Sequence, residues 1–560
     1  MTIDSAWLKT LRGMKDLATL DTLDVDGVKI ELPMASMGQR FRLRHWQRRV
    51  LPDVIPDSVH ADAPERTPFR LIFALTTPTA TENSIEKALG DELAPLEDVF
   101  RAETHSKQKK MTLAFHVLAV KAASKGESEC KAYTERTLIL LCRRQDGSFD
   151  KELMQQLVEQ FRRAPEQLDL AQRTLLNRLQ DGWTPEHEPH FIQPDSTHLR
   201  EVPFDFEAAR LFQRDLRSLL AANLPPADFF QQLNLLLCLH LGLYQPRVAA
   251  VLNPQMDILR REMARPDPQH LRELEALLDD FQRRHPFNGK LQCRAPDPEL
   301  RPVNLQTPAR ASFETLSNSL AEFHFNVLLL VQLRRLGEAY FAHKWDQVDA
   351  WRAGRLDRDT AELLSERVRG PREFMIALAD DPDYARFLDR ALTALVVRFI
   401  RQQLIAELNQ EDGLARLADE PSALDALRHL YVRYNIQSSR NKSNSRAYRQ
   451  GAGVTSSLLQ QGEYGLVKSR QRVGPYFELG AGLLPLLLLL AVGSENEKVP
   501  VTAFWARLSE YGLSFDHDER ARLLGRLRSM GVYERYSDAG EAAYVRNLMT
   551  TTTRGASHAS

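Results

Sequence analysis

The chain has 560 residues, of which 43% are hydrophobic and 27% charged, and its formal net charge is −1. This composition is that of a globular protein, and the near-neutral charge excludes an overall electrostatic field that would draw the chain to nucleic acid or to a membrane. One hydrophobic core rarely organises so long a chain, so we expect several domains.

Mixed periodicity marks residues 1–148 and predicts a mixed α/β domain. Alternation of apolar and polar residues over 28–32 and a short apolar run over 137–143 predict strands. The domain also holds Glu129 and Lys131, whose Glu-x-Lys spacing matches half of a nuclease motif. They lie in a polar stretch, whereas two-metal chemistry needs carboxylates placed rigidly on a core strand. A nuclease-type enzyme with a divergent N-terminal site therefore stays open as an alternative.

Residues 149–434 have helical period in nearly every segment and predict a large helical domain. Breaks that contain proline, such as Pro225-Pro226, separate the segments. The chain has no repeat of fixed length, which argues against a solenoid. The predicted helices cover 204–222, 227–244, 268–284, 313–340, 357–368 and 384–408.

Two features of this helical region bear on its packing. His240 stands among leucines, and this setting predicts a core histidine with a hydrogen-bond partner rather than a metal ligand. The helix over 313–340 carries a narrow apolar stripe, which favours packing inside a bundle over a short coiled coil with a partner. The stripe consists of Phe313, Leu316, Leu320, Phe323, Val327 and Leu330.

Residues 435–471 are rich in Ser, Asn, Gly and Arg, and they predict a flexible basic connector. Glu463 is the only acid between 433 and 472, while Tyr434, Tyr448 and Tyr464 are placed to stack on bases. A solvated linker without a ligand stays the alternative. The cations expected to bind DNA are Arg433, Arg440, Lys442, Arg446, Arg449, Lys468, Arg470 and Arg472.

Residues 472–549 predict a winged-helix domain. An apolar run over 483–492 and amphipathic segments over 500–511 and 516–530 predict three helices. Two short segments over 532–536 and 543–548 flank a Ser-Asp-Ala-Gly turn and predict the hairpin of a wing. We expect this unit to fold independently. The tail over 550–560 is rich in Thr, Ser, Gly and Ala and predicts disorder.

The helix predicted over 516–530 points to a ligand. Its apolar stripe, Leu523, Leu524, Leu527 and Met530, leaves the opposite face polar, with Gly525 in its middle. In a helix-turn-helix geometry the second helix lies in the major groove of DNA, where arginines reach phosphates and guanine edges. The candidate DNA-binding residues of this helix are Arg522, Arg526, Arg528 and Ser529.

Acids near the same helix keep a second interpretation open. Asp516, Asp518, Glu519, Glu534 and Glu541 partly cancel the positive charge of the arginines. Phosphate attraction needs net local positive charge, so a helical scaffold whose winged helix docks only protein is the alternative.

No cofactor or metal site is expected from the sequence. The glycine-rich stretch over 451–457 lacks the Gly-Lys-Ser/Thr ending of a nucleotide-binding loop, and Pro189 interrupts the helical spacing of His187 and His190. We therefore assign no catalytic residue from the residue types.

The expected compartment is the cytoplasm. The cysteines Cys130, Cys142, Cys238 and Cys293 form no CxxC pair and are typical of reduced, buried thiols. The N-terminus lacks the pattern of a signal peptide. The apolar run over 483–492 is about half as long as the roughly 20 residues that span a bilayer, so it predicts a buried helix and no membrane partner.

The C-terminal block resembles winged-helix tails of accessory subunits in bacterial anti-phage defence and restriction systems. The resemblance covers about the last hundred residues. It is based on the Arg-Val-Gly-Pro-Tyr-Phe stretch over 472–477, the apolar run over 483–492 and the turn over 536–540. It implies a non-catalytic partner of the ATPase, helicase or nuclease subunits of such a system. From the residues and this resemblance we expect a DNA-binding or adaptor subunit of a multi-protein assembly that binds duplex DNA weakly and without sequence preference.

Overall fold

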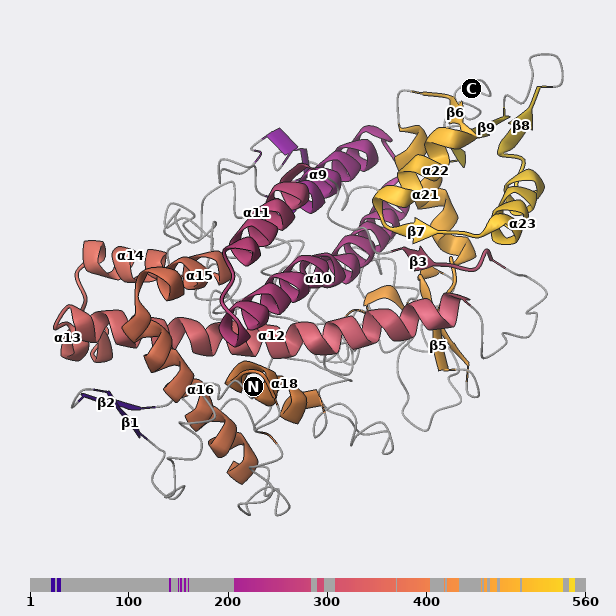
Figure 1. Ribbon diagram of the computed structural model, residues 1–560. Coiled ribbons are helices and arrows are strands. Elements are labelled where there is room, and N and C mark those ends of the chain that lie inside the picture. The colour runs from indigo at the N-terminus through magenta and orange to yellow at the C-terminus, as the bar shows by residue number, and fades with distance from the viewer. Residues whose placement is uncertain are drawn as a thin grey trace, which may run out of the picture.

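A computed structural model describes part of the chain, and the described part is mainly helical (Figure 1). Mainly α architecture is thus confirmed for these residues. The mixed α/β domain over 1–148, the connector cations before residue 450, and the tail over 550–560 lie largely or wholly outside them. The described residues are 22–25, 28–31, 141–142, 150, 152–153, 156–157, 160, 206–283, 290–296, 308–368, 370–402, 417, 420–432, 455, 458–460, 464–470, 474–493, 496–536 and 543–548.

Little of the first 148 residues is described. Strands β1 (Thr22–Val25) and β2 (Val28–Glu31) pair antiparallel, and β2 matches the strand expected over 28–32. The strand expected over 137–143 is wrong at Leu141, which is helical and fully buried. The carbonyl of Leu141 accepts a hydrogen bond from Gln213 Nε2 (3.0 Å), so this segment packs on the helical region.

Helices build the middle of the protein, and two of them span most of it (Figure 1). The long helices α10 and α12 pack on each other, α9 and α11 lie against α10, and α16 lies against α12 and α18. Their bounds are α9 Phe206–Ala221, α10 Pro226–Ala264, α11 Pro268–Arg283, α12 Pro308–Lys344, α13 Val348–Arg352, α14 Arg358–Arg367, α15 Pro371–Asp380, α16 Pro382–Gln402 and α18 Ala423–Tyr431.

Helix α10 is longer than its sequence predicts. We expected a helix that ends at Tyr244, but α10 continues through Pro246 and Pro254 to Ala264, so the predicted end is wrong. A proline inside a helix costs about 3 kcal/mol or more, because it removes a hydrogen bond and crowds the preceding turn. Most of the described side chains between Gln231 and Ala264 are buried, and this packing outweighs the local cost.

Among the described residues, the segment Gln231–Ala264 of α10 is the one helix that is long and apolar enough to cross a membrane by length and composition alone. In its most apolar window, 94% is buried inside the protein, as in the core helix of a soluble protein. The run over 483–492 forms the short helix α21 (Leu484–Val492), and Leu487 in its middle is fully buried, so the prediction of a buried helix is confirmed.

The apolar stripe of α12 packs inside the chain. Phe313, Leu320, Phe323, Val327 and Leu330 are all at most 5% exposed. Gly337, further along the helix, allows a close approach, because a Cβ added there would lie 2.3 Å from Val368 and 2.8 Å from the Tyr384 hydroxyl. The stripe therefore meets neighbouring helices of the same chain, as expected for a bundle.

The C-terminal elements lie at one end of the helical array, next to α9, α10 and β3 (Figure 1). Strand β9 is the centre of an antiparallel sheet of order β6-β9-β8, in which Val545 lies opposite both Val499 and Tyr533. The bounds are β3 Leu291–Gln292, β4 Val467–Arg470, β5 Gly474–Phe477, η9 Ala481–Leu483, α21 Leu484–Val492, β6 Lys498–Pro500, α22 Val501–Glu510, β7 Leu513–Ser514, α23 His517–Ser529, β8 Tyr533–Arg535 and β9 Ala543–Arg546.

These C-terminal helices and hairpin strands match the expected ranges to within about two residues, whereas the short strands β6 and β7 were not predicted. Part of the stretch expected to be a flexible connector is ordered: β4 pairs with β5, and Leu466 and Val467 are 1% exposed. The expectation of a flexible connector is therefore wrong for residues 464–470. Burial of Leu466 and Val467 against the rest of the protein explains why.

The described hydrophobic core crosses the expected domain boundary near residue 472. Strand β7 pairs in parallel with β3 of the helical region, and α21 contacts α9 and α10. Leu487 of α21 and Leu237 of α10 belong to one continuous buried cluster. The C-terminal unit therefore shares part of its core with the helical region.

Candidate nucleic-acid interface and the joint that holds it

Helix α23 begins and ends at residues that suit those positions. The Asp516 side chain caps its start by accepting a hydrogen bond from the Glu519 amide (2.8 Å). Acidic residues fill its first turn and Arg526 and Arg528 its last, which matches the helix dipole. Gly531, with a φ of +70°, then ends the helix in the left-handed region that favours glycine.

The two faces of α23 are divided as the sequence predicts. Leu523 and Leu527 are fully buried, and Leu524 and Met530 are partly buried against the same core. On the opposite face Arg522, Gly525, Arg528 and Ser529 are exposed, with Arg526 partly buried on the flank. A Cβ added at Gly525 would meet no atom within 4 Å, so this face is open at its centre.

The predicted arginines of α23 have different partners. Arg522 donates to Glu519 (Nη1 to Oε1, 2.9 Å). Arg528 lies over the Tyr533 ring, with its guanidinium carbon 4.7 Å from the ring centroid. Neither Arg526 nor Arg528 forms an ion pair with an acid in the described part of the chain. Of the predicted binding arginines, these two therefore contribute the uncompensated positive charge.

Glu519 attaches the start of α23 to the helical region. Its carboxylate accepts a hydrogen bond from the Ala295 amide (2.7 Å), which lies just beyond β3. Asp516 and Asp518 stay exposed at the same end, and the Asp518 side chain is 84% exposed. Carboxylates thus surround the positive end of the α23 dipole, which leaves the outward arginines as the positively charged part of the surface.

Of the predicted connector cations, only Lys468 has a described side chain. It forms an ion pair with Glu478 (2.8 Å), whose side chain is 2% exposed and which also faces Arg294 (3.6 Å). Arg470 lies in β4, and its side chain is outside the described residues, as are Arg433, Arg440, Lys442, Arg446, Arg449 and Arg472. Lys468 therefore neutralises a buried acid, while the other connector cations stay predictions.

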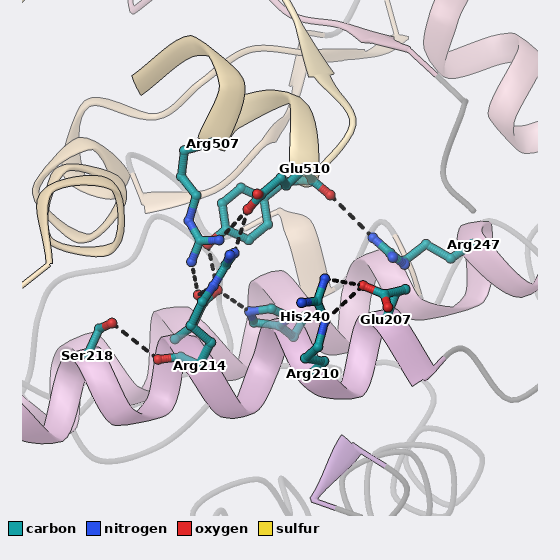
Figure 2. A network of polar contacts seen from close by, with 10 residues as sticks. Glu207, Arg210, Arg214, Ser218, His240, Arg247, Arg507 and Glu510 are labelled. Carbon is teal, nitrogen blue, oxygen red and sulfur yellow. Dashed lines mark hydrogen bonds and ion pairs between the residues drawn. The ribbon is translucent and has the colours of Figure 1, made fainter. Parts of the chain in front are cut away.

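A buried polar cluster, which we call the joint, links α22 to α9 and α10 (Figure 2). Its centre is Asp215 of α9, fully buried, which accepts hydrogen bonds from Arg507 and from the Tyr511 hydroxyl (2.5 Å). The His240 ring of α10 is the third partner, with Nε2 2.9 Å from the carboxylate. His240 is thus a core histidine with a hydrogen-bond partner, as the sequence predicts.

The rim of the joint adds contacts around Glu510 of α22. Its carboxylate pairs with Arg507 and with Arg214 of α9 (2.5 Å to Arg214), and its carbonyl accepts from Arg247 of α10 (3.3 Å). Burial, together with the Asp215 carboxylate, raises the pKa of the Tyr511 hydroxyl well above its ordinary value. Tyr511 therefore stays a hydrogen-bond donor, and the joint holds α22 in one orientation on the helical region.

The joint was not predicted from the sequence. Asp215 lies 292 residues from Arg507 and 296 from Tyr511, so no local pattern connects them. The only available signal is the polar residue at position 215 between apolar neighbours that face the core. A buried acid needs a partner, but the sequence does not say which residue provides it.

The described cysteines are buried thiols, and no metal site is found among the described residues. Cys142, Cys238 and Cys293 are free and buried, as expected, and burial raises the pKa of the Cys238 thiol to about 12. Within the described ranges, no three His, Cys, Asp or Glu side chains come together in a way that holds a metal ion.

No protein-family model matches the chain, and no curated protein is similar to it.

Proposed function

We propose that the C-terminal elements form a winged helix and that the chain is a non-catalytic DNA-binding or adaptor subunit of a multi-protein assembly. The order helix, strand, helix, short strand, helix, hairpin from α21 to β9 supports this, as does the central place of β9 in its sheet. In this fold α23 is the helix that enters the major groove.

The exposed arginine face of α23 carries the proposal. Arg526 and Arg528 stand beside Ser529 on the side away from Leu523 and Leu527, and no described acid pairs with either arginine. Phosphates attract such cations without regard to base sequence. The Ser529 hydroxyl donates to the Arg526 carbonyl (2.7 Å) and would have to exchange this partner to donate to a phosphate oxygen. The ligand is therefore duplex DNA, bound weakly and with little sequence preference.

The acids at the start of α23 restrict how DNA approaches. Asp516 and Asp518 are exposed there, and they repel phosphates from the first turn. Glu519 also fixes this turn to Ala295. Contact is therefore made by the last two turns of α23, supplemented by connector cations such as Arg440 and Arg446.

The adaptor part of the proposal rests on the joint. A mobile winged helix searches for its ligand on a tether, whereas the joint fixes α22 to α9 and α10 through Asp215. A fixed orientation suits a subunit that places DNA relative to other proteins. Membership of a bacterial defence or restriction assembly in the cytoplasm is the part of this proposal that comes from the resemblance of the C-terminal block.

A protein-docking scaffold is the second candidate function. The observation that favours it is the mixed charge of α23, where Asp516, Asp518 and Glu519 accompany the arginines. A surface of both signs matches a protein partner better than a polyanion.

Fluorescence anisotropy with a labelled DNA duplex tests the proposal. The test variant changes Arg522, Arg526 and Arg528 together to Glu. The matched control changes three solvent-accessible arginines of the α13–α16 region, Arg355, Arg372 and Arg386, to Glu. Both variants shift the net charge equally, so a difference between them reports position and not total charge.

We expect the α23 variant to lose duplex binding, because repulsion replaces its phosphate contacts, and the control variant to keep it. Circular dichroism melting should show that both variants stay folded, since all six side chains lie off the buried stripes. Equal binding of the α23 variant and wild type would refute DNA contact through α23. No salt-sensitive binding of the wild type to any nucleic acid would refute DNA binding and leave the protein-docking scaffold.

A further inference from the structure

A pair of tyrosines lies on the hairpin that follows α23. The rings of Tyr536 and Tyr544 meet edge to face, with centroids 5.8 Å apart and an interplanar angle of 78°. Tyr536 is 44% exposed, which makes it one of the few strongly exposed large apolar side chains in the described part of the protein. Val545 points to the core, so its neighbour Tyr544 belongs to the outer face of the sheet.

Charged groups hold this pair in place. Lys498 of β6 donates to the Tyr536 hydroxyl (2.6 Å), and that hydroxyl donates to Glu534 (2.9 Å). Glu534 in turn pairs with Arg546 of β9. We call this group the wing cluster: Lys498, Glu534, Tyr536, Tyr544 and Arg546.

The wing cluster holds Tyr536 by its hydroxyl. The hydroxyl of Tyr536 makes its polar contacts, and its ring contacts the ring of Tyr544 on the neighbouring strand. The ring therefore lies on the sheet surface and is not inserted into the core. The ammonium of Lys498 lies 4.7 Å from the Tyr536 centroid and 5.3 Å from that of Tyr544. The hydrogen bond to Tyr536 raises the pKa of Lys498, so this cation stays charged at neutral pH.

The described charges beside the rings nearly balance, with three cations and two acids. Lys498 and Arg546 share Glu534, and Glu497 lies 4.0 Å from Arg546. Arg535 adds an exposed cation that pairs with no described acid. An aromatic surface next to cations is what proteins use to bind single-stranded nucleic acid, because bases stack on the rings and phosphates contact the cations.

The wing cluster also lies next to the proposed DNA-binding face. Only Met530, Gly531 and Val532 separate α23 from β8, and Arg528 of α23 covers Tyr533 at the start of that strand. Tyr533 pairs with the core-facing Val545, so Arg528 lies over the face of the sheet opposite to Tyr544. A DNA molecule that contacts the last turns of α23 therefore meets the wing cluster at the end of β8, where Tyr536 lies.

We propose that the wing cluster stacks an unpaired base, so that the protein prefers the end or junction of a duplex, where single-stranded DNA begins, over continuous duplex. Tyr536 provides the stacking surface, Tyr544 supports its ring, and Arg535, which pairs with no described acid, contacts an adjoining phosphate. This inference rests on the proposed DNA binding and deepens it, since it names the form of DNA that is recognised.

Three DNAs of the same duplex sequence test the inference: a blunt two-strand duplex, and the same duplex with a 5′ or a 3′ single-stranded extension. The variants are Tyr536→Ala, which removes the ring, and Tyr536→Phe, which keeps the ring and removes the hydroxyl. Leu363→Ala, a truncation of an exposed apolar side chain on α14, is the matched control. Anisotropy titrations give the ratio of affinities for extended and blunt DNA for each protein.

For the wild type we expect at least one extension to raise the affinity about five- to hundredfold, the range for stacking of one base. Tyr536→Ala should reduce this ratio to near one and leave blunt-duplex affinity unchanged, whereas Tyr536→Phe and Leu363→Ala should keep it.

Each contrary result has its own meaning. Equal wild-type affinity for blunt and extended DNA overturns the inference and leaves the proposed duplex binding intact. A preference that survives Tyr536→Ala overturns it as well, because the base then stacks elsewhere. No binding of the wild type to any of the three DNAs overturns both proposals.

Discussion

Two groups of arginines in the C-terminal unit have opposite surroundings. Arg507 of α22 is 7% exposed, donates to the fully buried Asp215 and also pairs with Glu510. Arg528 of α23 is exposed, and its only described contact is with the ring of Tyr533.

This contrast separates structural from ligand-binding charge. A buried arginine that satisfies a buried acid contributes to orientation and specificity of packing, and removing it leaves the acid buried without its partner. An exposed arginine without an acid contributes little to folding, so its charge is available to a ligand. The joint and the α23 face therefore illustrate the two roles within one unit, and mutations at each of them test that division.

The largest expected loss of stability comes from placing a charge where it can neither pair with a buried group nor reach a ligand. Leu487 of α21 is fully buried among apolar residues. Leu487→Asp should unfold the C-terminal unit, because burial of an unpaired carboxylate costs several kcal/mol, of the order of the whole stability of a domain. Ala503→Asp, in the exposed first turn of α22, is the control. Urea unfolding followed by circular dichroism measures both, and a folded Leu487→Asp protein that instead loses membrane association would place α21 in lipid.

Breaking the joint should have the next largest effect. Arg507→Met removes the buried guanidinium partner of Asp215 and leaves only the half-exposed Arg214 near it (Nε to Oδ1, 3.6 Å), so we expect a loss of about 3 kcal/mol in the free energy of unfolding, the lower end for a broken buried ion pair. Arg528→Met should change it by less than about 1 kcal/mol, the scale of an exposed cation–π contact.

A double-mutant cycle sharpens this test of the joint. Asp215→Asn removes the buried negative charge and keeps an oxygen that accepts from Tyr511. The combination of Asp215→Asn with Arg507→Met should therefore be less destabilised than the sum of the single changes. Additive losses would show that Asp215 and Arg507 do not depend on each other.

Asp389 of the helical region is a partly buried acid without a described ion pair, so a smaller effect on stability is expected from changing it. Burial raises the pKa of Asp389 on α16 to about 6, and Asp389 forms no ion pair with a described residue. Its ordinary value is 3.8. In the folded state Asp389 therefore stays protonated up to a higher pH than in the unfolded state. The contribution of Asp389 to the free energy of unfolding falls as the pH rises from 3.8 to about 6, and it stays low above that.

Asp389→Asn should accordingly raise the melting temperature at pH 7 relative to wild type and leave it nearly unchanged at the acidic end of that window. Melting curves at the two pH values measure the effect. A variant that is equally destabilised at both would show that the Asp389 carboxylate makes favourable contacts in the folded protein.

The smallest expected effect concerns the middle of the α23 face. Gly525 is exposed, and an added Cβ meets nothing within 4 Å. Gly525→Ala should stabilise the unit by about 0.5–1 kcal/mol, the difference in helix propensity. If DNA backbone approaches this glycine closely, the same variant should bind duplex more weakly despite its greater stability. Stability and affinity measured on one preparation distinguish a packing role from a binding role.

Local patterns predicted the C-terminal elements well. The spacing of Leu523 and Leu527 identifies the buried face of α23, and the leucines of α21 identify a buried helix, because both signals lie within one element. Strands β6 and β7 have three residues or fewer, too short for alternation to show. Their pairing with β9 and β3 depends on residues far away in the sequence.

Tertiary packing explains the remaining differences. Pro246 predicts a helix end, but burial of α10 on nearly all sides keeps the helix continuous. Lys468 has the sequence surroundings of a free connector cation, yet the buried Glu478 comes within 2.8 Å of it once β4 and β5 pair. The joint was hidden for the same reason, since Asp215 and Arg507 lie in different parts of the chain.

The salt dependence of duplex binding tests the central claim most directly. Wild type and a variant with Arg522, Arg526 and Arg528 all changed to Gln are titrated with the same duplex over a series of salt concentrations. Removing one arginine that neutralises a phosphate should flatten the slope of log affinity against log salt by about 0.9. We predict a flatter slope for the triple variant and an unchanged slope for Arg507→Met under conditions in which it is folded. Equal slopes for the wild type and the triple variant would contradict the account, because the exposed arginines of α23 would then contact no phosphate.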